Sequence, residues 1–338
     1  FRKSRRQNFA RRKSFDAMNI KNKISAIITF LIFISCQSDV SKAYVPESNG
    51  NINTLTVVMN NNLWEGKLGN NIKEILMEPY EGLPFDEPKY DLYHLQPSIF
   101  KGFARSSRNI IVFNKDTVGQ GFRLIKNLWA RPQVTAIITG EDEDVMNFYF
   151  DENKDLLLRS ISENERVEKI RRMTKSLNDD PQLQDRFGIN LTFPDAYSTV
   201  KDTANFVWIE KEVAKGHLNI ITYTLPINID LQKIEERIPA IRDSIGRIYV
   251  PGRVPGSYMI TERAYLPYYY KTKVNNLDAI LTKGTWEVQN DFMAGPYVNY
   301  IIKDTVNKRN IVIEGFSFAP SESKRDYMFE LNTIITTM

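Results

Sequence analysis

The sequence predicts an α+β fold in which mostly antiparallel sheets are each covered by helices. Three observations support this class. Runs of β-branched residues are bounded by turn residues, as in strands. Segments with helical apolar spacing follow such strands and would cover one face of a sheet. The C-terminal half also contains two similar units, each a hairpin followed by a helix, and hairpins imply antiparallel pairing.

The first part of the fold is expected over residues 54–178. Residues 55–59 are predicted to form a strand rich in β-branched residues. The three asparagines at 60–62 end this strand and can cap the start of a helix. That helix is predicted at 63–77, where apolar residues recur at helical spacing: Leu63, Trp64, Leu68, Ile72, Ile75 and Leu76. Three further elements follow: a loop at 82–88 and strands at 90–95 and 108–113.

A glycine loop at 118–121 precedes an apolar-periodic segment at 122–129, which we expect to be a helix leading to a strand at 133–139. A glycine loop that opens a helix can hold a phosphate on free backbone N–H groups. This loop has two glycines and lacks the lysine and hydroxyl pair of a P-loop. We therefore favour a tight turn between strand and helix over a phosphate site.

The longest predicted helix spans residues 141–177. It begins with four acids at 141–144 and ends in a basic group: Lys169, Arg171, Arg172 and Lys175. This order of charges matches the helix macrodipole. The acids lack the spaced ligands and central glycine of a calcium loop, so a solvated helix terminus is the favoured interpretation.

From residue 179 to 338 we expect a second α+β domain. The same order of strand, polar turn, strand and proline occurs at residues 205–226 and again at 296–320. A helix is predicted after each of them, at 231–244 and at 325–336. The two hairpin-plus-helix units suggest an internal duplication, although hairpin sequences converge easily.

The N-terminal region has the layout of a lipoprotein signal peptide. Two lysines precede an apolar run at 24–34, which is followed by a small residue and by Cys36, the single cysteine of the chain. The run is shorter than the roughly 20 residues that a membrane helix needs. We therefore predict a signal peptide at 18–35, lipid on Cys36 and a lipidated tether at 36–53. The alternative is a free thiol beside an N-terminal membrane helix.

Residues 1–17 precede the first methionine and are expected to be an upstream extension, either a mis-assigned start or a long basic leader. Residues 1–35 carry nine of the 45 Lys and Arg but one of the 41 acids, so 36 basic and 40 acidic residues follow them. A mildly acidic chain has no general attraction for nucleic acid, and no nucleic-acid partner is predicted.

Catalytic residue types are scarce. The chain has two histidines, His94 and His217, and lipidation of its one cysteine leaves no free thiol. This excludes His–Cys catalysis and thiolate metal sites and makes an ordinary zinc site improbable. No catalytic residue, metal or cofactor is therefore predicted. Paired carboxylates remain open because acids are numerous.

An aromatic cluster is the candidate binding surface for a protein or glycan partner. It comprises Tyr265, Tyr268, Tyr269, Tyr270 and Trp286. Tyrosine and tryptophan supply rigid amphipathic surface for such partners, whereas core filling is the competing explanation. Side chains at 268–270 would alternate along a strand, so at least one of them should face outward.

Several segments resemble an uncharacterised family of lipoproteins from Bacteroidetes, defined as a domain of unknown function. They are YVPESNGNINTLTVVM at 44–59, LWEG at 63–66, GLPFDEP at 82–88, FKGFAR at 100–105, SRNII at 107–111 and RPQ at 131–133. The resemblance implies an outer-membrane lipoprotein and assigns no site residues. Gln37 is not the aspartate that retains lipoproteins in the inner membrane of well-known Gram-negative bacteria, which agrees with that location but leaves the membrane face undecided.

From these observations we expect a lipid-anchored, non-catalytic binding or assembly component of an envelope complex. The alternative is a carboxylate-dependent envelope hydrolase that acts on glycan or peptide. A cavity with convergent acids would favour the enzyme, and an aromatic or grooved surface would favour the binding protein.

Overall fold

The computed structural model describes residues 45–229, 231 and 233–338. Residues from Val45 to Met338 form one compact unit. The predicted extension at 1–17, the signal peptide at 18–35 and Cys36 lie outside the described residues. No helix within the described ranges is both long enough and apolar enough to cross a membrane.

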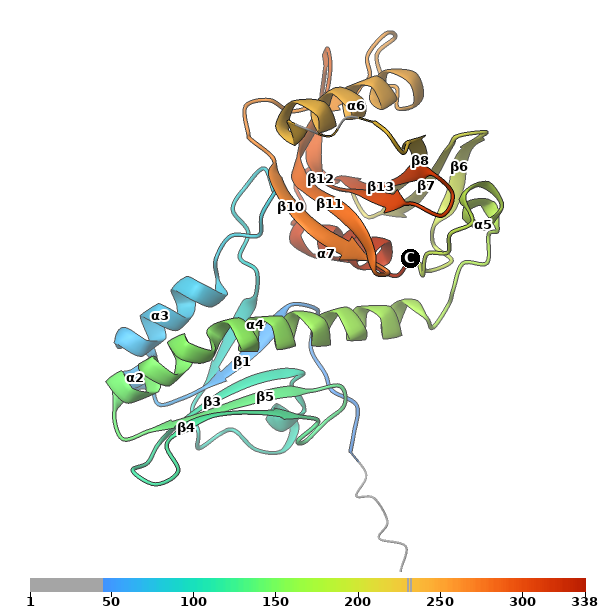
Figure 1. The fold of residues 1–338 in the computed structure, drawn as a ribbon. Coiled ribbons are helices and arrows are strands. Elements are labelled where there is room, and N and C mark those ends of the chain that lie inside the picture. The colour runs from blue at the N-terminus through green and yellow to red at the C-terminus, as the bar shows by residue number, and fades with distance from the viewer. Residues whose placement is uncertain (1–44, 230, 232) are drawn as a thin grey trace, which may run out of the picture. The chain divides into compact units, whose positions relative to one another are not determined.

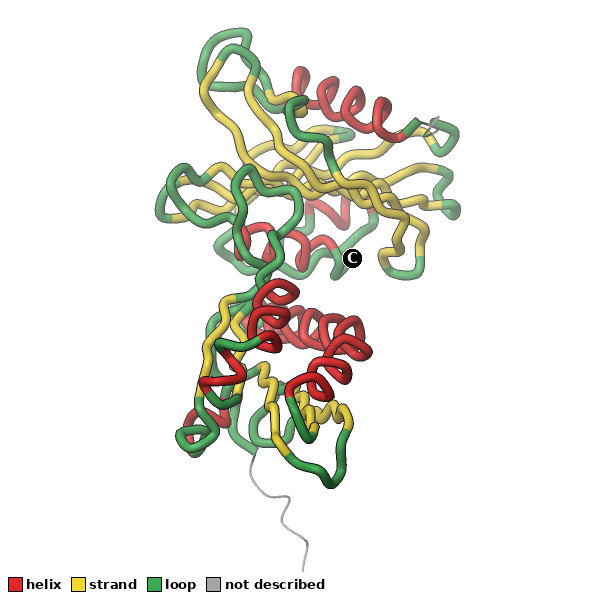
Figure 2. The backbone as a smooth tube through the Cα atoms, turned by 90° about the vertical axis from the view of Figure 1, so that its left-hand side faces the viewer, coloured by secondary structure: helices red, strands yellow, loops and turns green. Residues whose placement is uncertain are grey.

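The chain builds two sheets, seen with their helices in Figures 1 and 2. The first has five strands in the order β2-β1-β3-β5-β4. These strands are β1 (Thr54–Val58), β2 (Asp91–Leu95), β3 (Asn109–Lys115), β4 (Gly121–Lys126) and β5 (Val134–Gly140). The helices of this part are α2 (Asn61–Trp64), α3 (Lys67–Leu76), the 3-10 helix η1 (Gly102–Ser106) and α4 (Glu143–Met173).

Helices α3 and α4 cover one face of the five-stranded sheet. Their apolar stripes enter one core with the strands through Leu68, Ile72, Leu76, Phe150, Leu157 and Ile161. A smaller core around Phe100 covers the opposite face. The predicted stripe is therefore confirmed. The helix itself is interrupted at Glu65 and Gly66, where the Glu143 carboxylate accepts a 2.7 Å hydrogen bond from the Leu68 N–H at the start of α3.

The predicted helix at 122–129 is wrong, because the chain forms strand β4 there and pairs antiparallel with β5. Exposed Arg123 lies between the partly buried Phe122 and Leu124, which is strand alternation. The preceding glycine loop is a turn between two strands, held by a 2.9 Å hydrogen bond from the Val118 N–H to the Asp116 carboxylate. No helix begins after this loop, so the phosphate-cradling geometry considered from sequence does not form.

The second sheet has eight strands, and every pairing in it is antiparallel. Its main path is β10-β11-β12-β13-β8-β7-β6, with β9 paired to β11. The strands are β6 (Ser198–Thr203), β7 (Phe206–Val213), β8 (Gly216–Pro226), β9 (Met259–Thr261), β10 (Tyr268–Val274), β11 (Leu277–Val288), β12 (Asp291–Asp304) and β13 (Arg309–Phe318). The helices of this part are α5 (Gln182–Phe187), α6 (Ile234–Tyr249) and α7 (Arg325–Ile335).

Both predicted hairpin-plus-helix units are present. Strands β7 and β8 precede α6, and strands β12 and β13 precede α7. The two helices lie on opposite faces of the sheet (Figure 1), each over its own core. The α+β class is confirmed. The antiparallel expectation holds for this sheet, whereas β1, β2, β3 and β5 of the smaller sheet pair in parallel and β4 alone runs antiparallel.

A buried carboxylate on α7 joins elements from both parts of the chain. Glu330 is 9% exposed and accepts contacts from Lys169 Nζ of α4 at 2.5 Å and Lys211 Nζ of β7 at 2.7 Å. The Tyr197 hydroxyl donates to the same carboxylate at 2.9 Å. Burial alone would raise the pKa of Glu330, but the two ammonium groups lower it overall.

This network makes stability depend on pH in the acid range. Because the pKa of Glu330 is lower in the folded protein than in the unfolded chain, its contribution is present above about pH 4.3 and is lost as pH falls through the folded pKa. We expect Glu330→Gln to lower the free energy of unfolding at pH 7 by about 1.5–3 kcal/mol. Urea unfolding at pH 7 and pH 3.5 should show a smaller pH dependence in the variant. If the free energy of unfolding falls equally between pH 7 and pH 3.5 in the unchanged protein and in the variant, Glu330 is not the group that causes the pH dependence.

Candidate functional site

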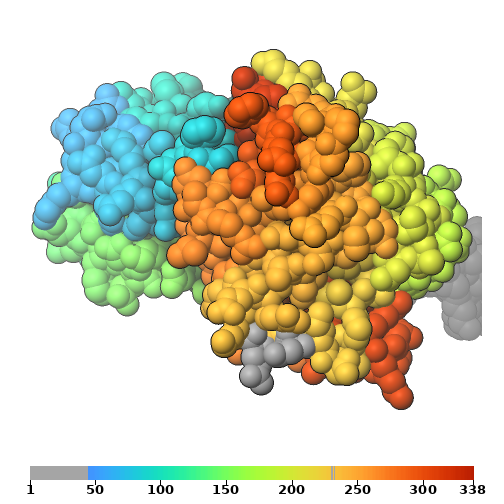
Figure 3. All heavy atoms as spheres, turned by 90° about the horizontal axis from the view of Figure 1, so that it is seen from above, coloured from blue at the N-terminus to red at the C-terminus, as the bar shows by residue number. Residues whose placement is uncertain are grey.

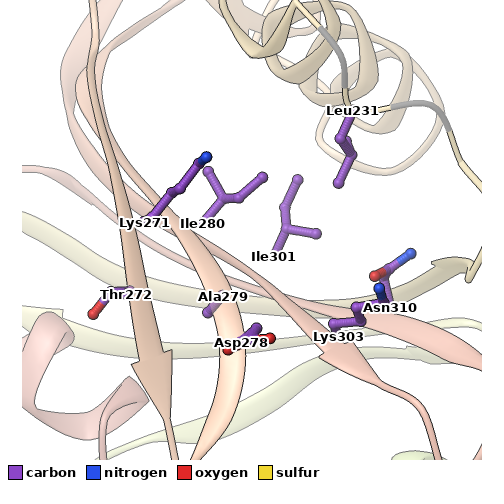
Figure 4. A pocket seen from close by; sticks show the side chains of 9 residues that line it. All are labelled: Leu231, Lys271, Thr272, Asp278, Ala279, Ile280, Ile301, Lys303 and Asn310. Carbon is purple, nitrogen blue, oxygen red and sulfur yellow. The ribbon is translucent and has the colours of Figure 1, made fainter.

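An open cavity lies between Leu231, just before α6, and the face of strands β10 to β13 (Figure 4). Its volume is about 410 Å³. The apolar lining consists of Leu231, Ala279, Ile280 and Ile301, and the polar lining of Lys271, Thr272, Asp278, Lys303 and Asn310. Ligand sites typically have this size and this excess of apolar lining.

The strand register explains how these side chains meet. Lys271 of β10 is opposite Ile280 of β11, which is opposite Ile301 of β12. Residues opposite one another on paired strands share a face, so this row forms an apolar floor with a lysine at one end. In the next row, Lys303 of β12 is opposite Asn310 of β13. The floor is therefore flanked by ammonium groups from two different strands.

The charges around the cavity do not cancel. Its one carboxylate, Asp278, lies 3.5 Å from Lys273 Nζ, and both side chains are exposed. Neither Lys271 nor Lys303 has an ion-pair partner among the described residues. Two exposed cations thus border a floor in which Ile301 is buried and Ile280 and Leu231 are partly buried. This arrangement suits a ligand with an apolar body and an anionic group.

A buried polar row under α6 lies beside the floor. Thr282 of β11 is opposite Asn299 of β12, which is opposite Glu314 of β13. The Arg242 guanidinium of α6 donates to both Glu314 oxygens at 2.8 and 2.7 Å. Burial alone would lower the pKa of Arg242, but the neighbouring Glu314 carboxylate raises it overall. This ion pair fixes α6 over the sheet next to the cavity.

The structure distributes the five predicted aromatic residues over different environments. Tyr265, Tyr268 and Tyr270 are exposed, Tyr269 is half-buried against the core under α6, and Trp286 is a buried member of that core. None of the five lines the cavity. Trp286 is 3% exposed, so its side chain contributes no binding surface.

The exposed tyrosines lie on and next to β10, which is an edge strand of the eight-stranded sheet. The Tyr270 hydroxyl donates to the Glu81 carboxylate at 2.9 Å, and burial together with this acid raises the pKa of Tyr270 to about 12. Residues near 260–300, in orange, make up much of the molecular face seen in Figure 3. Tyr265 is 59% exposed and Tyr268 is 47% exposed, so both rings are accessible to a partner.

Neither of the two histidines that the sequence singled out lines the cavity. His94 stacks on Trp64, with ring centroids 4.7 Å apart, and bonds the Met59 carbonyl oxygen at 2.9 Å. His217 lies 3.1 Å from Glu210 on the hairpin of β7 and β8. Across the part of the chain that the structure describes, no group of three or more His, Cys, Asp or Glu residues is placed to hold a metal ion.

One pair of carboxylates does interact. Burial and the neighbouring Glu262 raise the pKa of Glu287 above its usual value. Both residues lie where β9 joins β11, and neither lines the cavity. This pair was not predicted, because no sequence spacing places the end of β9 beside Glu287.

Comparisons with known proteins find uncharacterised domains. Residues 48–174 match the model described as Domain of unknown function (DUF8532), and residues 176–337 match Domain of unknown function (DUF4837). No curated protein matches the chain. The solved structures that match include the crystal structure of LpqN, described as involved in cell envelope biogenesis of Mycobacterium tuberculosis. It is 12% identical, with a TM-score of 0.27 over 44% of this chain and 80% of that chain. The two domain matches support an uncharacterised domain family.

Proposed function

We propose that this protein is a non-catalytic binding component of the cell envelope, held at the outer membrane by lipid on Cys36. Its cavity on the eight-stranded sheet binds a small amphiphile with an anionic group. The single observation that carries this proposal is the apolar floor of Ile280 and Ile301 bordered by Lys271 and Lys303, two cations that form no ion pair with any residue the structure describes.

The energetics favour an amphiphile over a purely polar ligand. Covering the floor removes apolar surface from water at about 25 cal/mol per Å². An anionic group near either ammonium gains a charge-assisted hydrogen bond, since neither lysine forms an ion pair with an acid of the described residues and Asp278 lies beside Lys273 instead. A purely apolar ligand would lack the second contribution. The exposed tyrosines on β10 remain the predicted surface for a protein or glycan partner.

The alternative of a carboxylate-dependent hydrolase finds less support. Such an enzyme needs two acids that converge on one substrate. The cavity has one acid, Asp278, which is exposed and lies beside Lys273. The interacting acids Glu262 and Glu287 do not line it. We therefore favour a binding function.

The test is calorimetric titration of the full protein with decanoate and with the uncharged decanol. We expect decanoate to bind and decanol to bind at least about 10-fold more weakly. Lys271→Gln and Lys303→Gln should each weaken decanoate binding about 10-fold, which corresponds to ~1.4 kcal/mol. These side chains are exposed, so the variants should fold normally.

Lys308→Gln serves as the matched control. Lys308 is an exposed lysine in the turn between β12 and β13 and does not line the cavity. This variant removes the same charge and should bind decanoate as the unchanged protein does. Equal losses in all three variants, or equal affinity for decanoate and decanol, would overturn the cavity assignment.

A further inference from the structure

A second recess lies at the carboxyl edge of the five-stranded sheet, with a volume of about 660 Å³. Its polar lining comes from residues that follow or end three neighbouring strands. Asn60 follows β1, Asn114, Lys115 and Asp116 lie at the end of β3, and Thr139 lies at the end of β5. Arg123 of β4 completes the polar lining. Nothing in the proposed function uses this recess.

The topology makes this edge a favourable place for a ligand. After β1 the chain next forms β2, on one side of β1, and after β3 it next forms β4, on the other side of β3. The chain thus leaves the adjacent parallel strands β1 and β3 in opposite directions. In open sheets with parallel strands, ligands commonly bind outside the carboxyl ends of the strands. Asn60 follows β1 and Lys115 ends β3 at this edge.

The charges of the recess are unbalanced. Lys115 and Arg123 are exposed, and neither has an ion pair or side-chain hydrogen bond within the described ranges. The one acid, Asp116, accepts the 2.9 Å hydrogen bond from the Val118 N–H, so its carboxylate is partly engaged in the turn. Two cations are therefore available to an incoming anion.

Neutral hydrogen-bonding groups share the face of Arg123, whereas Lys115 follows Asn114 and alternates to the other face of the sheet end. Asn114 of β3 is opposite Thr139 of β5, and Thr139 is opposite Gly121 of β4. Arg123 lies one row away on the same face as Gly121 because side chains alternate along a strand. An amide, a hydroxyl and a guanidinium thus line one polar surface, which suits hydroxyl groups together with a negative charge.

We propose that this recess binds a small hydrophilic anion of the size of a phosphorylated or carboxylated monosaccharide. Arg123 contacts its anionic group, Lys115 adds a second positive charge at the rim of the recess, and Asn60, Asn114 and Thr139 hydrogen-bond its hydroxyl groups. The ligand class differs from that of the cavity on the eight-stranded sheet, which has an apolar floor. The two sites are therefore distinguished by the class of ligand that each one binds.

The experiment is titration of the full protein with glucose 6-phosphate, glucuronate, glucose and inorganic phosphate. We expect both charged sugars to bind, and glucose and phosphate each to bind at least about 10-fold more weakly. Lys115→Gln and Arg123→Gln should each weaken binding of the charged sugars about 10-fold. Raising the salt concentration should also weaken it, because exposed charges are screened.

Lys126→Gln is the matched control. Lys126 is exposed on the same strand as Arg123 but does not line the recess, so this variant should bind within about 2-fold of the unchanged protein. Absence of binding by both charged sugars would overturn the proposal, as would equal losses in the control. Phosphate binding as tight as that of glucose 6-phosphate would overturn the sugar assignment.

Discussion

Glu165→Gln is expected to lower the free energy of unfolding by about 3–5 kcal/mol, because it breaks a fully buried ion pair. Glu165 on α4 and Arg108 before β3 are both 0% exposed, with Arg108 Nε 2.7 Å from the carboxylate. The Asn53 N–H and the Asn109 side-chain amide donate to the same carboxylate. Every neighbour of Glu165 in this network is a donor, so a glutamine NH₂ would face another donor. Arg108 would keep only Glu168, whose carboxylate lies 3.9 Å away, as a buried counter-charge.

Chemical denaturation followed by tryptophan fluorescence measures this effect, and the same helix supplies a control. Glu163 lies two residues earlier on α4 and pairs with Arg166 at 2.8 Å, but both side chains are partly exposed. Exposed pairs contribute about 0–1 kcal/mol, so Glu163→Gln should cost no more than that. If the two substitutions cost the same, burial of the Arg108–Glu165 pair is not what stabilises this region.

Cys36→Ser is expected to abolish lipid attachment altogether. Cys36 is the one thiol in the chain, so no other side chain can carry a thioether-linked diacylglyceryl group. Serine keeps the size of the side chain but removes the sulfur. Stable anchoring takes two or more acyl chains, because a single myristoyl chain binds a membrane only marginally. Loss of this modification should therefore remove the proposed anchor.

Metabolic labelling with an alkyne-tagged palmitate in a Gram-negative host checks this expectation. The unchanged protein should take up the label, and mass spectrometry should place its N-terminus at a lipid-modified Cys36. Ser35→Ala keeps a small residue before the cysteine and should still be labelled. An unlabelled parent protein, a labelled Cys36→Ser variant or a retained leader at 18–35 would contradict the lipoprotein assignment.

The periodic elements of this fold follow from local spacing and were predicted from it. The long helix, both hairpin-plus-helix units and the buried stripe with Leu68 and Ile72 all agree with the structure. Strand β4 was mistaken for a helix because the apolar residues Phe122, Leu124 and Ile125 fit either period over so short a run. Pairing with β5, which sequence spacing does not show, decides between them.

The candidate site could not be predicted in the same way. Lys271 and Lys303 belong to β10 and β12, and only the register through β11 brings them to one apolar floor. The exposure of the aromatic cluster could not be predicted from the sequence either. Tyr265 and Tyr268 are exposed, yet Trp286 is buried because it packs under α6 and against Phe316. Composition identified these residues but could not say which side of the sheet each one faces.

The sequence by itself determined the α+β class, the order of most elements and the expectation of a lipid anchor at Cys36, because each depends on residues close together in the chain. Only the tertiary structure decided which cations lie beside an apolar floor, which lie at a polar edge and which charges are buried in pairs. Those properties depend on strand register and helix packing, which join residues that no local pattern connects.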